Sequence, residues 1–207
     1  VKGSDIIKYY HQDSYVTHSG SLGNSCMKYD RCSKFLELYN DNDVVSMLVM
    51  MNSEGGLIGR ALLWEFDGNK VMDRIYTTSD EDYQYYFMKW ADNNGFIYKK
   101  RQNWANTLQF VSNGKDIESE VEIQLSNWDY IYYPYLDTFK WFDKKSGKLF
   151  NYKPKSGSTE EMARDYWIFI YMCNGINVKD LCLLKRKNIS EKLIEYERSK
   201  TKRSKSE

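Results

Sequence analysis

The chain has 207 residues, of which 42% are hydrophobic and 29% charged, so it can bury a core and global disorder is not expected. Its 2 prolines exclude a collagen-like or proline-rich chain, and a net charge of +1 excludes a globally basic nucleic-acid binder. The 18 tyrosines favour tyrosine-lined sheets or surfaces that stack on a partner.

The first part of the chain predicts an α+β domain with an antiparallel β-meander and flanking helices. Residues 1–25 are expected to form short strands and turns, and the apolar spacing over 27–38 predicts a helix. Ser79, followed by three acidic residues, predicts the start of a helix that ends near Gly95. The strands expected in this part, in chain order, are 44–51, 57–66, 70–77, 96–100, 108–111, 121–125 and 130–133.

The composition changes after this part, and residues 153–159 resemble a linker. A helix is expected from Thr159 to Met172, a second helix or turn over 178–184 and a short strand over 192–198. We therefore expect two parts, an α+β domain at 1–147 and a small helical segment with a basic tail at 148–207. The last 23 residues hold nine Lys/Arg and four Asp/Glu, which suggests a tail that contacts phosphate or stays solvated.

The sequence contains no apolar run long enough to cross a bilayer and no apolar signal core near its first residue, so we expect a cytoplasmic protein with no membrane partner. The four cysteines are scattered and are expected to be free thiols. His11 and His18 are the only histidines, and no ligand set with metal-site spacing accompanies them. No metal and no cofactor are expected.

Asp73 and Arg74 are adjacent within the third predicted strand of the meander. Side chains alternate along a strand, so these two are expected on opposite faces. A structural ion pair with another strand is then a more natural role for them than joint catalysis.

The meander over 44–77, followed by a helix and a strand at Ile97, resembles the core of the GNAT acyltransferases. The resemblance implies a GNAT-like fold and, as an alternative function, an acyltransferase. Such enzymes hold the pyrophosphate of acyl-CoA at a glycine-rich helix N-terminus. The corresponding residues here, 77–82, contain no glycine and three carboxylates, which speaks against acetyl-CoA chemistry.

Residues 19–39 and 133–139 are similar to uncharacterised phage proteins. This similarity implies a viral context and no particular activity. Four tyrosines near the second segment, Tyr130, Tyr132, Tyr133 and Tyr135, would offer rigid contact area to a host protein, or they simply pack within a strand.

The C-terminal segment 153–201 resembles the start of the catalytic domain of tyrosine recombinases, the phage-type integrases found on Bacteroides-like mobile elements. The resemblance rests on residues 157–161, 163–167, 174–181 and 198–201, taken in order. It implies a protein related to DNA recombination and integration.

The resemblance also assigns candidate catalytic residues. Asn177 takes the place of the family's first arginine, so the charge that would stabilise the phosphate is missing there, and Lys200 matches the family's catalytic lysine. The family's His-x-x-Arg box and nucleophilic tyrosine would follow Glu207, so the chain is expected to be catalytically incomplete on its own. Weak, sequence-independent DNA binding is expected through Lys185, Arg186, Lys187, Lys202 and Arg203, together with Lys200.

Overall fold

The structure is a computed structural model, and it describes residues 1–40 and 43–154. Residues Val1–Pro154 form one compact unit, and Lys155–Glu207 form a second unit that lies outside the described residues. The first unit is a mixed α+β domain with a sheet-rich core, as the sequence predicts. The helices and basic tail expected after residue 154 lie outside the described part.

The first unit contains short helices near its N-terminus, one long helix and ten strands among the described residues. The α-helices are α1 (Asp5–Tyr10), α2 (Gly20–Gly23), α3 (Glu37–Asn40) and α4 (Asp80–Asn94), with 3₁₀ turns at Gln12–Ser14 and Asp30–Phe35. The strands are β1 (Val45–Met51), β2 (Leu57–Phe66), β3 (Asn69–Met72), β4 (Tyr76–Thr77), β5 (Ile97–Lys99), β6 (Gln109–Ser112), β7 (Lys115–Glu118), β8 (Glu122–Gln124), β9 (Trp141–Asp143) and β10 (Lys148–Phe150).

The larger sheet has the strand order β1-β2-β3-β5-β6-β7, with β4 paired to β2 beyond the end of β3. The first three strands form the predicted antiparallel meander, and β5, β6 and β7 form another. β3 and β5 run parallel, because α4 carries the chain across the sheet between β4 and β5. A second sheet of three antiparallel strands has the order β8-β10-β9.

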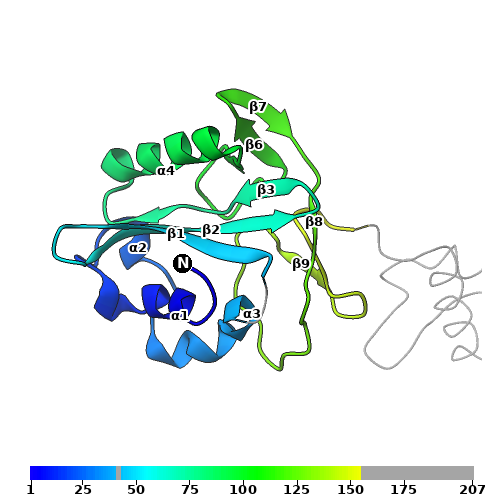
Figure 1. The fold of residues 1–207 in the computed structure, drawn as a ribbon, viewed down its shortest axis with the longest axis horizontal. Helices are drawn as coiled ribbons and strands as arrows, with labels where there is room; N and C mark the ends of the chain where they lie inside the picture. The colour runs from blue at the N-terminus through cyan, green and yellow to red at the C-terminus, as the bar shows by residue number, and fades with distance from the viewer. Residues whose placement is uncertain (41–42, 155–207) are drawn as a thin grey trace, which may run out of the picture. The chain divides into compact units, whose positions relative to one another are not determined.

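Both faces of β2 are covered, which explains why this strand is almost continuously apolar. Ala61 and Leu63 point to the face on which α4 packs, through Phe87 and Ala91. The intervening Leu62 and Trp64 belong to a larger cluster on the opposite face, with residues of α1, α3 and the second sheet. Figure 1 shows α4 on one side of β1 and β2 and the N-terminal helices on the other.

The predicted strand at 57–66 and the helix between Ser79 and Gly95 are confirmed. Ser79 is the N-cap of α4, three acidic residues occupy its first turn, and Gly95 ends it in the left-handed conformation with φ 73°. The hairpin between β2 and β3 turns at Asp67 and Gly68, whose φ angles are 48° and 77°. Two consecutive positive φ values are what an Asp-Gly hairpin turn supplies.

Other predicted elements are wrong. Residues 1–25 contain short helices and turns, with no strand, and 27–38 holds a 3₁₀ turn followed by α3 in place of one helix. The stretch 70–77 is interrupted after Met72, so it forms β3 and β4. Residues 130–133 form no strand, because Tyr133 folds back and donates its hydroxyl to the carbonyl of Trp128.

The first unit ends at Pro154 rather than at 147, since β10 pairs with both β8 and β9. The buried side chain of Asn151 anchors the C-terminal end of this unit through three hydrogen bonds. Its amide nitrogen donates to the carbonyls of Thr107 and Ser119 at 2.9 Å and 2.8 Å, and its oxygen accepts from the backbone of Val121 at 2.7 Å.

Candidate functional site

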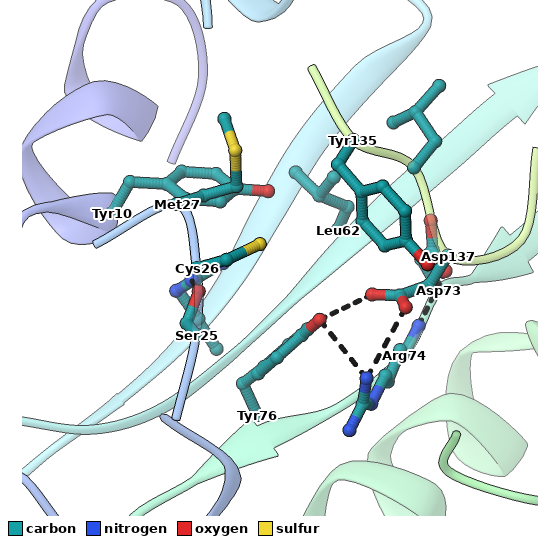
Figure 2. Close-up of a pocket in the computed structure, with 12 residues that line it drawn as sticks. Tyr10, Ser25, Cys26, Met27, Leu62, Asp73, Arg74, Tyr76, Tyr135 and Asp137 are labelled. Carbon is teal, nitrogen blue, oxygen red and sulfur yellow. Dashed lines mark hydrogen bonds and ion pairs between the residues drawn. The ribbon is translucent and has the colours of Figure 1, made fainter. Parts of the chain in front are cut away.

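A small polar pocket lies on the face of β2 opposite α4. Its walls come from five segments far apart in sequence: the end of α1, residues 25–27, β2, residues 73–76 and the loop 135–137. The enclosed part has a volume of about 20 Å³, which is room for about one water molecule or for the head of a small ligand. Figure 2 shows the polar side chains that surround this space.

Arg60 is the most unusual wall residue, because it is a cation that is only 2% exposed. Its guanidinium carbon lies 3.7 Å from the ring centre of Tyr10 and 5.0 Å from that of Tyr76. Its Nη2 donates to Ser25 Oγ at 3.0 Å, while its Nε has no hydrogen-bond partner. Among the described residues, no carboxylate forms an ion pair with it.

The charge on Arg60 is kept despite its burial. Burial disfavours the cation, but the oxygens of Tyr10, Tyr15 and Tyr76 outweigh this effect and hold the pKa of Arg60 above its usual value. An uncompensated buried charge costs several kcal/mol. A guanidinium carries five N–H donors in one plane, and an aromatic ring against its face leaves the edge for a planar acceptor.

Arg74 lies in the same pocket and already has its counter-ion. Its Nη1 is 3.3 Å from Asp137 Oδ1 and 3.4 Å from the hydroxyl of Tyr76, which in turn donates to Asp137 Oδ2. These dashed contacts form a closed triangle in Figure 2. Burial, followed by the nearby Asp137 carboxylate, raises the pKa of Tyr76 well above its usual value, so Tyr76 remains a proton donor.

Asp73 and Arg74 both line the pocket, so the prediction that they lie on opposite faces is wrong. β3 ends at Met72, and the strand alternation on which the prediction depended stops there. Asp73 Oδ1 instead accepts from the backbone N–H of Arg74 at 2.7 Å and from the hydroxyl of Thr138. Burial and the neighbouring Asp137 raise the pKa of Asp73.

Lys99 is a second buried cation close to Asp73. It is fully buried on β5, and its Nζ donates to the carbonyl of Ala105 at 3.4 Å. Burial lowers the pKa of Lys99, and the charges of Asp73 and Asp137 counter part of that effect. The two carboxylates therefore offset only part of the cost of burying the Lys99 cation.

Residues 25–27 bring a thiol to the pocket. Ser25 is buried and takes the hydrogen bond from Arg60, and Cys26, the next residue, is exposed. The side chain of Cys26 points into the space between Tyr10, Tyr76 and Tyr135 in Figure 2. The backbone here is held by the Ser25 N–H, which donates to the carbonyl of Leu22 at 3.1 Å.

The residues that the recombinase resemblance singled out lie outside the described residues. These are Asn177, Lys185, Arg186, Lys187, Lys200, Lys202 and Arg203. Their roles stay predictions.

The tyrosines proposed to contact a host protein do not form one strand face. Tyr133 is partly buried and packs 4.7 Å, centre to centre, from Phe142, whereas Tyr132 and Tyr135 are exposed. Ile131, next to them, is 87% exposed. Tyr135 belongs to the rim of the pocket described above.

The N-terminus of α4, where a GNAT enzyme would hold pyrophosphate, is occupied by the chain itself. Ser21 Oγ donates to Asp80 Oδ1 at 2.6 Å, and Ser19 Oγ donates to the carbonyl of Thr78 at 2.8 Å. A Cβ on Gly20 would come within 2.3 Å of the carbonyl oxygen of Thr77. α2 therefore covers the N-terminus of α4, in keeping with the expectation that 77–82 do not hold a pyrophosphate.

Arg60, Cys26 and Asp137 are not among the site residues that the sequence alone predicts. One signal was available, because Arg60 lies in the middle of β2 among apolar residues, whereas the other charged residue of this strand, Glu65, lies near its end. A charged residue in the middle of a mostly apolar strand is expected to be buried with its neighbours. A buried charge needs a partner, so such a residue is a candidate for a binding site. Nothing local marks the loop 135–137, which reaches the pocket only through the tertiary fold.

Comparisons with protein-family models, with curated proteins and with solved structures give no match for this chain. Over residues 1–40 and 43–154, no group of three or more His, Cys, Asp or Glu is arranged to hold a metal ion. No helix in this same part is both long enough and apolar enough to cross a membrane.

Proposed function

We propose that the first unit binds a small molecule through a carboxylate group, which pairs with Arg60 in the pocket. The observation that carries this proposal is the buried guanidinium with an unpartnered Nε and no counter-ion among the described residues. A carboxylate matches the planar fork of donors at the edge of a guanidinium and would neutralise its charge.

The charge of the pocket favours a carboxylate over a phosphate. The enclosed volume of about 20 Å³ admits only a small group. Asp73 and Asp137 also line the pocket, and they repel a doubly charged phosphate more strongly than a singly charged carboxylate. The rest of the ligand would extend past the exposed rim residues Cys26 and Tyr135.

The proposal is tested by thermal unfolding of the full chain in increasing potassium acetate at constant ionic strength. A ligand that binds only the folded state raises the melting temperature, and tenfold excess over its Kd stabilises the fold by about 1.4 kcal/mol. We expect a saturating rise with acetate in the wild type and no such rise in Arg60→Met.

Arg31→Met is the matched control, since Arg31 is an exposed arginine that also lies over a tyrosine, 4.7 Å from the ring centre of Tyr29. It should respond to acetate as the wild type does. An equal response in Arg60→Met, or none in the wild type, would overturn the proposal. A saturating, Arg60-dependent response to inorganic phosphate but not to acetate would overturn the choice of carboxylate.

A GNAT-like fold is supported by the parallel pair β3 and β5, joined through α4 after an antiparallel meander. Acetyl-CoA binding at the N-terminus of α4 would require α2 to leave its contacts with Thr77, Thr78 and Asp80. Isothermal calorimetry with acetyl-CoA tests the acyltransferase alternative, which predicts measurable heat.

A role in DNA recombination is a separate proposal for the second unit. It is supported by the nine Lys/Arg of the last 23 residues and by the ordered resemblance of 153–201 to tyrosine recombinases. Weak binding to duplex DNA should then fall steeply as salt rises, because counterion release drives it. A gel shift that is unchanged between low and high salt would contradict this proposal.

A further inference from the structure

We infer that Cys26 is the nucleophile of the pocket and forms a covalent bond with a ligand whose carboxylate is held by Arg60. This inference rests on the proposed function and extends it from binding to chemistry. The ligand class is a small carboxylate that carries an electrophilic carbon with a leaving group a few bonds from the carboxylate.

The position of the thiol supports this role. Cys26 directly follows Ser25, whose Oγ accepts the hydrogen bond from Arg60, so the thiol lies one residue from an anchor on the guanidinium. Its side chain is exposed and points into the pocket in Figure 2. A reagent from solvent can therefore reach the thiol at the rim of the pocket that Arg60 also lines.

The backbone that carries Cys26 is fixed on both sides. Ser25 is anchored to Arg60 and to the carbonyl of Leu22, and the thiol of Cys32 donates to the carbonyl of Cys26 at 3.5 Å. Cys32 is itself buried, so these two neighbouring cysteines have different surroundings. Cys32 supports the loop, and Cys26 presents its sulfur to the ligand.

The reaction is a substitution at carbon. The sulfur of Cys26 forms a bond to the electrophilic carbon, the bond from that carbon to the leaving group breaks, and its electron pair departs with the leaving group. The thiol proton passes to the leaving group or to solvent. No oxidant or reductant is needed, and the positive charge of Arg60 attracts the anionic ligand to the thiol.

The test compares two alkylating reagents that differ in charge, iodoacetate and iodoacetamide, on the full chain. Peptide mass spectrometry follows the rate at Cys26 and at Cys32 separately, and the same chain unfolded in urea gives the intrinsic ratio of the two rates. We expect the iodoacetate-to-iodoacetamide ratio at Cys26 to be at least about tenfold higher in the folded protein than in the unfolded chain.

The excess should disappear in Arg60→Met and remain in Arg31→Met. Added acetate should slow iodoacetate at Cys26 in the wild type, which keeps the test valid even if Arg60→Met folds poorly. A folded-state ratio equal to the unfolded one, with the acetate-dependent thermal shift still present, would refute the role of Cys26 and leave carboxylate binding standing. Loss of both effects would refute the proposed function itself.

Discussion

Arg60 and Trp64 lie on the same face of β2, four residues apart, and both are buried to 2% exposure or less. Trp64 is enclosed by rings, with the centre of Phe139 at 5.3 Å and that of Tyr39 at 6.2 Å. Arg60 also has rings beside it, those of Tyr10 and Tyr76, but it borders a cavity.

Each of these side chains has an N–H without a partner, Nε1 in Trp64 and Nε in Arg60. For the neutral indole the loss is that of one hydrogen bond, which is about 1–3 kcal/mol, and the packed rings offset it. The guanidinium keeps its charge through the neighbouring tyrosines and forms no ion pair with a carboxylate of the described residues. The same strand face therefore serves stability at one end and binding at the other.

The largest effect is expected from Trp64→Ala. Removing a fully buried indole from packed rings should lower the free energy of unfolding by about 3–5 kcal/mol, measured by urea denaturation. Trp104→Ala is the control, since Trp104 is 63% exposed and its loss should cost less than about 1 kcal/mol. Similar losses for the two variants would contradict the structural role assigned to Trp64.

Asp137→Asn should have the next largest effect, because it removes the counter-ion of Arg74 and weakens the bond from Tyr76. Hydrogen bonds to a buried charge contribute about 1.5–3 kcal/mol, so a loss of about 2 kcal/mol is expected in the same assay. Asp116→Asn breaks the exposed pair with Lys100 and should cost less than about 1 kcal/mol. If both variants lose equally little, the Arg74 pair is not a buried one in solution.

Arg60→Met should have a smaller effect and lower the free energy of unfolding by about 1 kcal/mol in the absence of ligand. The raised pKa of Arg60 means that the folded protein favours its cation, and the variant also loses the bond to Ser25, while methionine keeps much of the apolar stem. The same variant should lose its response to acetate, which separates its role in binding from this modest role in stability. A rise in the free energy of unfolding would show that the guanidinium is held at a net cost to the fold.

On the face of β2 that carries both residues, the surroundings of Trp64 could be predicted from the sequence better than those of Arg60. Strand periodicity and the Asp-Gly turn are local signals, and they placed β1, β2 and α4 within a residue or so of their observed bounds. The pocket depends on three loops, 25–27, 73–75 and 135–137, and loop positions follow from tertiary contacts. The error at Asp73 and Arg74 has this origin, because strand alternation was extended beyond the end of β3.

The smallest expected effect concerns how the free energy of unfolding depends on pH. A carboxyl group in the pocket and one on the protein surface should contribute to this dependence with opposite signs. The raised pKa of Asp73 means that the folded protein holds this proton above pH 3.8 more firmly than the unfolded chain does. The contribution of Asp73 to stability therefore falls as pH rises from 3.8 through its folded pKa. In the exposed Glu122, hydrogen bonds from Tyr152 and Lys148 lower the pKa below 4.5, so its contribution is present above 4.5 and is lost as pH falls.

Asp73→Asn and Glu122→Gln should accordingly change the pH dependence of stability with opposite signs. Asparagine can still accept from Thr138 and from the Arg74 backbone, so Asp73→Asn should remove a decline in stability between pH 3.8 and neutrality. Glu122→Gln should remove a smaller gain over the range just below 4.5, because solvent screens its bonds. Urea denaturation from pH 3.5 to 7 measures both slopes. The opposite outcome is that Asp73→Asn shifts the slope in the same direction as Glu122→Gln. The carboxyl of Asp73 would then be charged and well compensated in the folded protein. In that case the pocket around Arg60 would carry more negative charge than the raised pKa of Asp73 implies.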